Sequence, residues 1–204
     1  MSTQAPTVPI PAEPPELEAR IVTIGSYLIA AATAFFFVAF LFAFLYLRAL
    51  NTNGLWGGGK PHHHVHAALT VGIIVLASVL ASVVVLRLAL GELRGQARPL
   101  WRLAALGAVA LGLAAVGVQC WQYTDLGFGP GDGGYASVYL GWTGFFSIFA
   151  LGVMLWLEAV LASTRRADAV AGVRVQGDVA SVSLVWTMLG LVEIASFILL
   201  YVVT

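Results

Sequence analysis

The chain has 204 residues, of which 60% are hydrophobic and 10% charged, and its mean hydropathy is +0.92. Soluble globular domains carry about 25% charged residues, so this composition indicates an integral membrane protein. The formal net charge is zero, which gives no electrostatic case for a nucleic-acid partner. The single cysteine, Cys120, excludes an internal disulfide, and its place in an apolar run predicts a buried thiol.

The first 20 residues are rich in proline and contain three acidic side chains, which predicts a flexible tail. They lack the basic start of a secretory signal, and the apolar run that follows is too long for one. We therefore expect a tail at residues 1–20 that is not cleaved, followed by a membrane domain at 21–204.

Five apolar segments are each long enough to cross the hydrocarbon core, which takes about 20 helical residues. Each segment is continuously apolar rather than alternating, so the sequence predicts helices and not a β-barrel. The expected fold class is an all-α integral membrane protein with a bundle of five transmembrane helices, at about 21–49, 67–90, 101–124, 136–163 and 179–203.

Basic residues predict the orientation of the five helices. The two connections after the second and fourth segments hold most of them: Arg94, Arg98, Arg102, Arg165, Arg166 and Arg174. The opposite connections hold only Lys60, with Arg48 at the end of the first segment. By the positive-inside rule, the N-terminus is cytoplasmic and the C-terminus lies outside.

Glu193 is the one ionisable side chain near the middle of a predicted span. Its insertion costs roughly 3 kcal/mol at the bilayer centre, so it should face protein or water. Ser183, Thr187 and Gly190 precede it at helical spacing, which favours close helix contact on that side. Two interpretations are open: a proton-linked carboxylate, or a hydrogen-bonded glutamate that fixes helix packing. We prefer the packing interpretation.

Four histidines open the second segment, in the run Pro61 to His66. His62 and His66 would share a helix face if the helix began that early, and neutral imidazoles bind copper and zinc well. No Cys, Asp or Glu lies within the run to complete a ligand set. We therefore predict no metal site and a polar interfacial loop, with His62 and His66 as weak candidate ligands.

Several separated motifs resemble subunit III of the haem–copper respiratory oxidases. The end of the first segment is similar to that family's phenylalanine-rich helix. The end of the third segment is similar to the family's Gln-x-x-Glu-Tyr motif. The fourth segment begins with a motif similar to the family's Tyr-x-Ser and continues with Thr-Gly-Phe, as in the family. The last segment carries Trp and Tyr at the family's separation. The residues are Phe35 to Phe37, Leu47, Arg48, Gln119 to Tyr123, Tyr135 to Tyr139, Thr143 to Phe145, Trp186 and Tyr201. The length and the five spans resemble the short form of the subunit, as in quinol oxidases.

The resemblance implies an accessory subunit, without catalytic residues or a cofactor of its own, in the respiratory chain of a bacterial plasma membrane. Its partners would be the catalytic subunit, which carries haem and copper, and the other oxidase subunits. It would bind phospholipid in a cleft between the first two helices and the remaining ones, and support oxygen access and proton uptake. Arg48 is the residue we expect to contact a lipid phosphate, or else to act as an ordinary interfacial anchor. Cytochrome c and quinol both stay open as electron donors.

The chain departs from the family at several polar positions. Thr33 replaces a membrane glutamate, Gln122 replaces the glutamate of the Gln-x-x-Glu-Tyr step, and Glu193 aligns with a tryptophan. The family's histidine and aspartate positions in the last two segments hold Phe146, Phe149, Thr187 and Gly190.

Two other functions are compatible with the sequence. A small proton-coupled transporter organised around Glu193 would need further polar residues facing it and a broken helix beside it. No predicted span contains a proline, which disfavours transport. An accessory subunit of a nitric oxide reductase would differ little in sequence from an oxidase subunit.

Overall fold

The computed structural model describes residues 15–51, 54–57, 66–95, 100–166 and 173–203, and these ranges contain only helices and their connections. Two short helices accompany five long ones: the 3₁₀-helix η1 and the π-helix η2, which continues α5 to its end. The bounds are α1 Pro15–Ala49, η1 Leu55–Gly57, α2 Leu69–Gly95, α3 Leu100–Thr124, α4 Gly134–Arg166, α5 Val173–Phe197 and η2 Ile198–Val202.

The five long helices are long and apolar enough to cross a membrane, which confirms the predicted number of spans. Their candidate spans agree with the predicted ones to within two residues, except that the second ends five residues after the predicted 90 and the fifth starts five residues before the predicted 179. The spans are Arg20–Ala49, Leu69–Gly95, Leu100–Thr124, Gly134–Thr164 and Arg174–Val202.

The first helix starts at Pro15, inside the segment that we predicted to be a tail. Proline suits the first position of a helix because its missing N–H would have no partner there. The acidic side chains that follow also favour a helix N-terminus. The predicted tail at 1–20 therefore overlaps α1 by six residues, 15 to 20, and residues 1–14 lie outside the described ranges.

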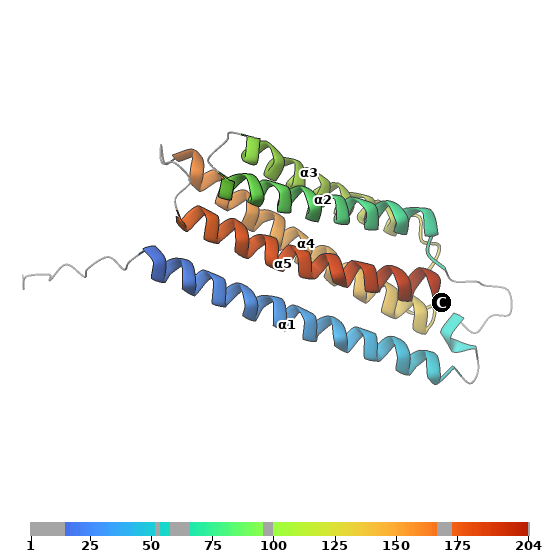
Figure 1. Cartoon of the computed structure of the whole chain (residues 1–204). Helices are drawn as coiled ribbons and strands as arrows, with labels where there is room; N and C mark the ends of the chain where they lie inside the picture. Colours follow the sequence, from blue (N-terminus) through green and yellow to red (C-terminus); the bar gives the residue numbers. More distant parts are fainter. Residues whose placement is uncertain (1–14, 52–53, 58–65, 96–99, 167–172, 204) are drawn as a thin grey trace, which may run out of the picture.

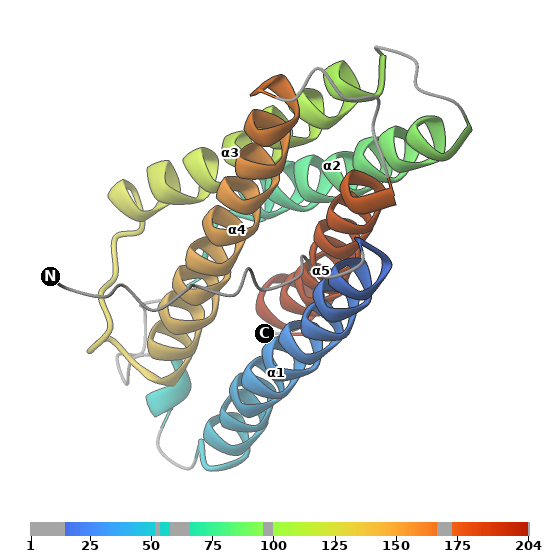
Figure 2. The same ribbon diagram turned by 90° about the vertical axis from the view of Figure 1, so that its left-hand side faces the viewer.

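Helix α5 lies at the centre of the bundle and packs against α1, α2 and α4. Helix α3 packs between α2 and α4. The start of α1 and the end of the chain lie at opposite ends of the bundle (Figure 1), as five crossings require. Figure 2 shows α1 running beside α5, away from the α2–α3 pair.

The expected division between the first two helices and the other three is wrong. Helices α1 and α2 each pack on α5, and α5 separates them, so they form no unit of their own.

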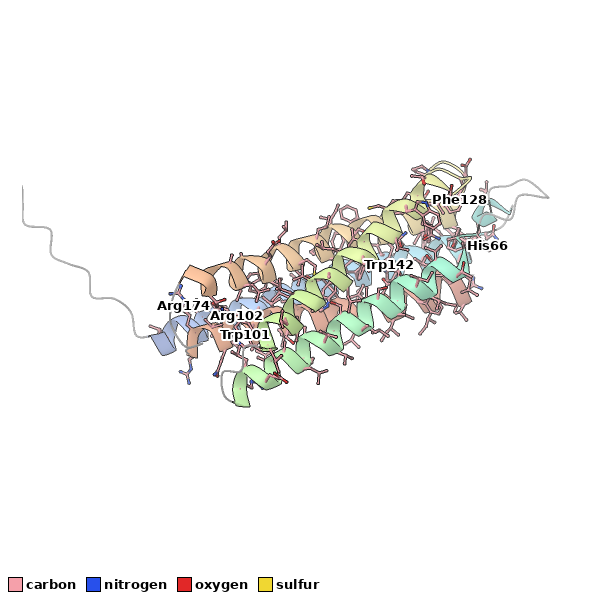
Figure 3. The ribbon with its side chains drawn as sticks, turned by 90° about the horizontal axis from the view of Figure 1, so that it is seen from above. His66, Trp101, Arg102, Phe128, Trp142 and Arg174 are labelled. Atoms are coloured by element: carbon pink, nitrogen blue, oxygen red, sulfur yellow. The ribbon has the colours of Figure 1, made fainter. Side chains whose placement is uncertain are left out.

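The two ends of the bundle differ in their residues: Arg102 and Arg174 lie at one end, and His66 and Phe128 lie at the other (Figure 3).

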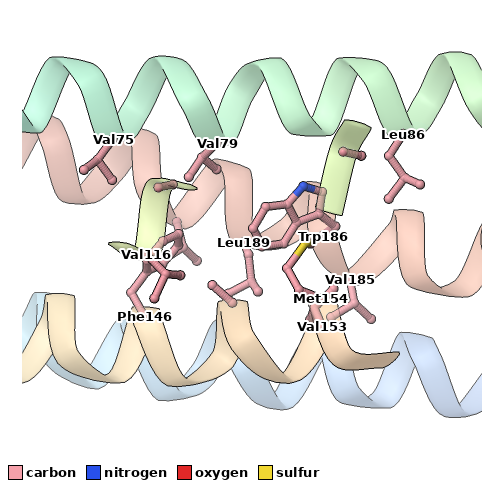
Figure 4. Packing of buried hydrophobic residues seen from close by; sticks show 14 of the residues in the cluster. Val75, Val79, Leu86, Val116, Phe146, Val153, Met154, Val185, Trp186 and Leu189 are labelled. Atoms are coloured by element: carbon pink, nitrogen blue, oxygen red, sulfur yellow. The ribbon is translucent and has the colours of Figure 1, made fainter. Parts of the chain in front are cut away.

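The core lies where α2, α3, α4 and α5 meet (Figure 4). Val79, Trp186, Leu189 and Met154 are almost fully buried there. A glycine allows α3 to approach α4 closely, because a Cβ at Gly112 would lie 2.5 Å from the Met154 sulfur. Small residues at such contacts are the usual means of packing helices in a membrane.

Aromatic rings fill the contact between α1 and α4. The Phe36 ring lies 5.1 Å from the Phe145 ring and 5.4 Å from the Phe149 ring, centroid to centroid. The Phe37 ring lies 5.9 Å from that of Trp142. The remaining surface of α1 is apolar and exposed, and only 17% of its span is buried, against 50% for α5. Helix α1 is therefore the peripheral helix of the bundle.

Candidate functional site

A polar cluster occupies the interior near the ends of α3 and η2 and the start of α4. The Gln122 Oε1 accepts a hydrogen bond from the Tyr139 hydroxyl at 2.8 Å and one from the Gln119 Nε2 at 3.3 Å. The Tyr139 hydroxyl also accepts one from Gln119 Nε2 at 3.2 Å, and its oxygen lies 3.0 Å from that of Tyr201. Together with Tyr135, these residues form what we call the tyrosine–glutamine cluster.

Tyr135 connects this cluster to η2 and to the segment before α2. Its hydroxyl donates to the Leu200 carbonyl at 3.0 Å and accepts from the Ala67 N–H at 3.2 Å. Leu200 lies in the π-helix, which is closed by a hydrogen bond from the Val203 N–H to the Ile198 carbonyl at 2.9 Å. Single π-turns of this kind often occur at functional sites. The cluster therefore ties three helices and one connection together.

Further hydroxyl bonds extend the cluster along α4. The Tyr123 hydroxyl donates to Thr143 Oγ1 at 2.8 Å, and the Thr143 hydroxyl donates to the Tyr139 carbonyl at 2.7 Å. The Ser147 hydroxyl donates to the Thr143 carbonyl at 2.9 Å. Buried hydroxyls in a membrane need such partners because lipid offers none.

Glu193 is buried, with 5% of its surface exposed, so its side chain faces protein rather than lipid. Among the described residues it has no hydrogen-bond partner. Its burial is compatible with both a proton-linked carboxylate and a packing role.

The stripe that precedes Glu193 contacts α2 at two of its positions. Thr187 accepts hydrogen bonds from Arg87 of α2 at 3.1 and 3.0 Å. A Cβ at Gly190 would lie 3.1 Å from Val83 of α2. These two positions hold a histidine and an aspartate in the oxidase family, and here they serve contact between α2 and α5.

The other positions that depart from the oxidase family are also packed inside the bundle. Phe146 and Phe149 lie against Phe37, at 6.5 and 5.8 Å between ring centroids. Thr33 is buried on α1, and Gln122 belongs to the tyrosine–glutamine cluster. The two aromatic replacements thus make the contact between α1 and α4 continuous.

Helix α2 begins at Leu69, so His66 precedes the helix. His62 lies outside the described residues. The His66 ring lies 5.5 Å from the Tyr135 ring, and it lines a cavity of about 520 Å³ together with Gln122 and Asp125. No group of three His, Cys, Asp or Glu side chains comes together within the described ranges.

Arg48 and Cys120 both lie on the surface of the described structure. Arg48 is in the last turn of α1, with its guanidinium 5.9 Å from the Phe44 ring centre. Cys120 is exposed, so the prediction of a buried thiol is wrong. An apolar run shows that a helix crosses the membrane, but it does not show which of its faces meets another helix.

A second buried junction joins α2, α3 and α5, and sequence reasoning missed it. The Trp186 indole N–H donates to Ser82 Oγ at 3.0 Å, and the Ser82 hydroxyl donates to the Ala108 carbonyl at 2.7 Å. The only sequence signal was the small-residue spacing of Ser78 and Ser82, which favours helix contact without specifying a partner.

The described residues thus belong to an all-helical protein with five candidate membrane spans and an internal tyrosine–glutamine cluster, the architecture of a multi-pass membrane protein. No known protein family matches the chain, and no curated protein sequence matches it either.

Proposed function

We propose that this chain is an accessory subunit of a bacterial haem–copper terminal oxidase, similar to subunit III. It stabilises the catalytic subunit, binds phospholipid, and supports oxygen access and proton uptake. One observation carries the proposal. The motifs that resemble the family lie in three separate parts of the sequence, and their Gln119, Tyr139 and Tyr201 meet in the tyrosine–glutamine cluster.

The hydrogen bonds of that cluster favour a structural role for these motifs. Gln122 Oε1 receives its bonds from neighbouring side chains, and Tyr135 holds η2 against α4. Apart from the Gln122 Nε2, which has no partner among the described residues, these side chains bond one another and hold the helices together, as an accessory subunit needs to do. Haem and copper would then belong to the partner subunit, which also receives the electrons.

The orientation and location belong to the same proposal. The end with Arg102 and Arg174 (Figure 3) would face the cytoplasm, and the end with His66 would face outside. In this orientation the N-terminus would lie inside and the C-terminus outside a bacterial plasma membrane. The exposed apolar surface of α1 is then available to lipid or to the neighbouring oxidase subunits.

Gentle purification of the tagged chain from its own membranes tests the proposal. We expect a haem-containing subunit to copurify, detected by its absorption spectrum, and oxygen consumption by the purified complex. Isolation of the chain as a haem-free functional oligomer would overturn the assignment. Consumption of nitric oxide in place of oxygen would identify the reductase alternative.

A proton-coupled transporter around Glu193 is the second candidate. Two features favour this function: the carboxyl group is buried, and the irregular η2 begins at Ile198, five residues after Glu193. Proteoliposomes that contain the chain alone and a pH-sensitive dye test this candidate. Proton flux that Glu193→Gln abolishes would favour transport, and no flux in either protein would exclude it.

A further inference from the structure

A polar groove lies between α1 and α2, with α5 as its floor, at the end of the bundle where α5 begins. Its cavity measures about 450 Å³. Arg87 and Arg94 contribute its positive charge, while Ser26 and Tyr27 line the α1 side. No acidic side chain is among the described residues that line it, so the arginine groove, as we call it, is positively charged.

Arg87 keeps part of its hydrogen-bonding capacity free. Its Nε and Nη2 donate to Thr187 Oγ1 at 3.1 and 3.0 Å. A guanidinium has five N–H groups, and Arg87 makes no other hydrogen bond to a described residue. It lies about 12 Å inside the end of α2, because eight residues at 1.5 Å each separate it from Gly95. An arginine at that depth needs a polar or anionic partner.

The floor of the groove contains two buried hydroxyls without partners. Ser181 and Ser183 of α5 both line the groove, and each is 2% exposed. Neither side-chain oxygen has a hydrogen-bond partner among the described residues. A buried hydroxyl without a partner is destabilising, and a ligand that bonds to it would remove that penalty. The groove therefore contains unused donors from two helices.

An apolar surface continues from the groove along α5. Leu184 lines the groove, and Leu191 and Ile198 follow at seven-residue intervals on the same face. Leu191 is 58% exposed and Ile198 is 46% exposed. From Leu184 to Ile198 the helix rises about 21 Å, more than half of a hydrocarbon core roughly 30 Å thick. An acyl chain can follow this surface, whereas a free anion makes no use of it.

We propose that the arginine groove binds the phosphate of an anionic glycerophospholipid, with an acyl chain along Leu184, Leu191 and Ile198 of α5. The planar guanidinium of Arg87 matches the geometry of a phosphate, and Arg94 adds a second charge. Basic pockets between transmembrane helices are suited to anionic head groups. This site is separate from Arg48, which lies in the last turn of α1.

Native mass spectrometry of the purified full chain with added lipid tests this proposal. We expect phosphatidylglycerol to remain bound at concentrations where phosphatidylcholine does not. The double substitution Arg87→Gln/Arg94→Gln should weaken phosphatidylglycerol binding about tenfold or more, because a charge-assisted hydrogen bond contributes roughly 1.5–3 kcal/mol. Arg102→Gln, which removes an arginine of α3 at the same end of the bundle but outside the groove, is the matched control and should leave the binding unchanged.

Two further measurements separate a lipid site from a site for a free anion. Inorganic phosphate and glycerol 3-phosphate in excess should not displace the lipid; displacement would identify a free-anion site and overturn the lipid assignment. Equal binding by the double variant and the wild type would also overturn it. Arg94 makes no hydrogen bond to a described residue, so Arg94→Gln alone carries the test if the double variant does not fold. The assay needs no partner subunit, so its result is independent of membership in an oxidase.

Discussion

The tyrosine–glutamine cluster and the arginine groove differ in how far their polar side chains find hydrogen-bond partners within the chain. Both contain polar side chains from several helices of one bundle. In the cluster, Tyr139, Gln119 and the Oε1 of Gln122 bond one another at 2.8–3.3 Å, and the Gln122 Nε2 is left without a partner among the described residues. In the groove, Ser181 and Ser183 have no partner and Arg87 is satisfied only in part.

The difference teaches how to separate structural from binding positions in a membrane protein. Water is absent from the hydrocarbon core, so a polar group there needs a partner from protein, lipid or a bound ligand. Groups that find their partners within the chain contribute to its stability. Groups that do not are candidates for a ligand, and their replacement should affect binding more than folding.

The largest effect is expected from Tyr139→Ala, which breaks the cluster at its centre. Tyr139 is fully buried and contacts Gln119, Gln122 and Tyr201. Removing a buried aromatic side chain leaves a cavity and typically costs about 3–5 kcal/mol of unfolding free energy. Denaturation of the purified chain in detergent, followed by circular dichroism, measures this loss.

Tyr139→Phe separates the hydroxyl from the ring. It should cost only about 0.6–1.7 kcal/mol, the range found for side-chain hydrogen bonds between membrane helices. Tyr46→Ala is the control, since Tyr46 is an exposed tyrosine on α1. If Tyr46→Ala destabilised the chain as much as Tyr139→Ala does, the cluster would have no special role in stability.

Two serine-to-alanine substitutions compare a hydroxyl that has partners with one that has none. Each removes one buried hydroxyl, so the chemical change is the same. Ser82→Ala removes the acceptor of the Trp186 indole N–H and should cost about 1–2 kcal/mol. Ser183→Ala removes a hydroxyl without a partner in the chain and should leave the unfolding free energy unchanged or raise it, because a buried hydroxyl without a partner is destabilising. The same denaturation assay compares them. Equal costs would mean that the hydroxyl of Ser183 is as well satisfied as that of Ser82.

Glu193→Gln should have the smallest effect. The substitution keeps the size of a buried side chain and removes its ability to ionise. If its role is packing, the oxygen consumption of the copurified oxidase should stay nearly unchanged. Inactivation during turnover, or loss of proton pumping with electron transfer intact, would instead assign the carboxylate to proton movement. Thr33→Ala, at another buried polar position, is a suitable control.

Hydropathy was enough to predict the five spans, because span length depends on the membrane and not on neighbouring helices. It was not enough to predict contacts. The apolar residues surround each helix, so no stripe marks the face that meets another helix, and Cys120 was placed on the wrong one. The start of α1 was also misplaced, because tail composition and helix start signals overlap at Pro15.

The candidate site was predicted only in part. The resemblance to an oxidase subunit selected Gln119, Tyr139 and Tyr201, but not their contact, which depends on how α3, α4 and η2 pack. Ser82 and Trp186 are 104 positions apart, and no local pattern relates them. The π-turn of η2 has no sequence signal either, because no glycine or proline lies in Ile198–Val202.

The position of α1 also has a consequence for synthesis. Its main contact is with α5, and 123 residues, 50 to 172, separate the two helices. At roughly 5–20 residues per second, α1 waits about 6–25 s in the membrane before the ribosome completes the chain up to α5. The aromatic face that later packs on α4 is accessible to a chaperone or to another nascent chain during part of that interval.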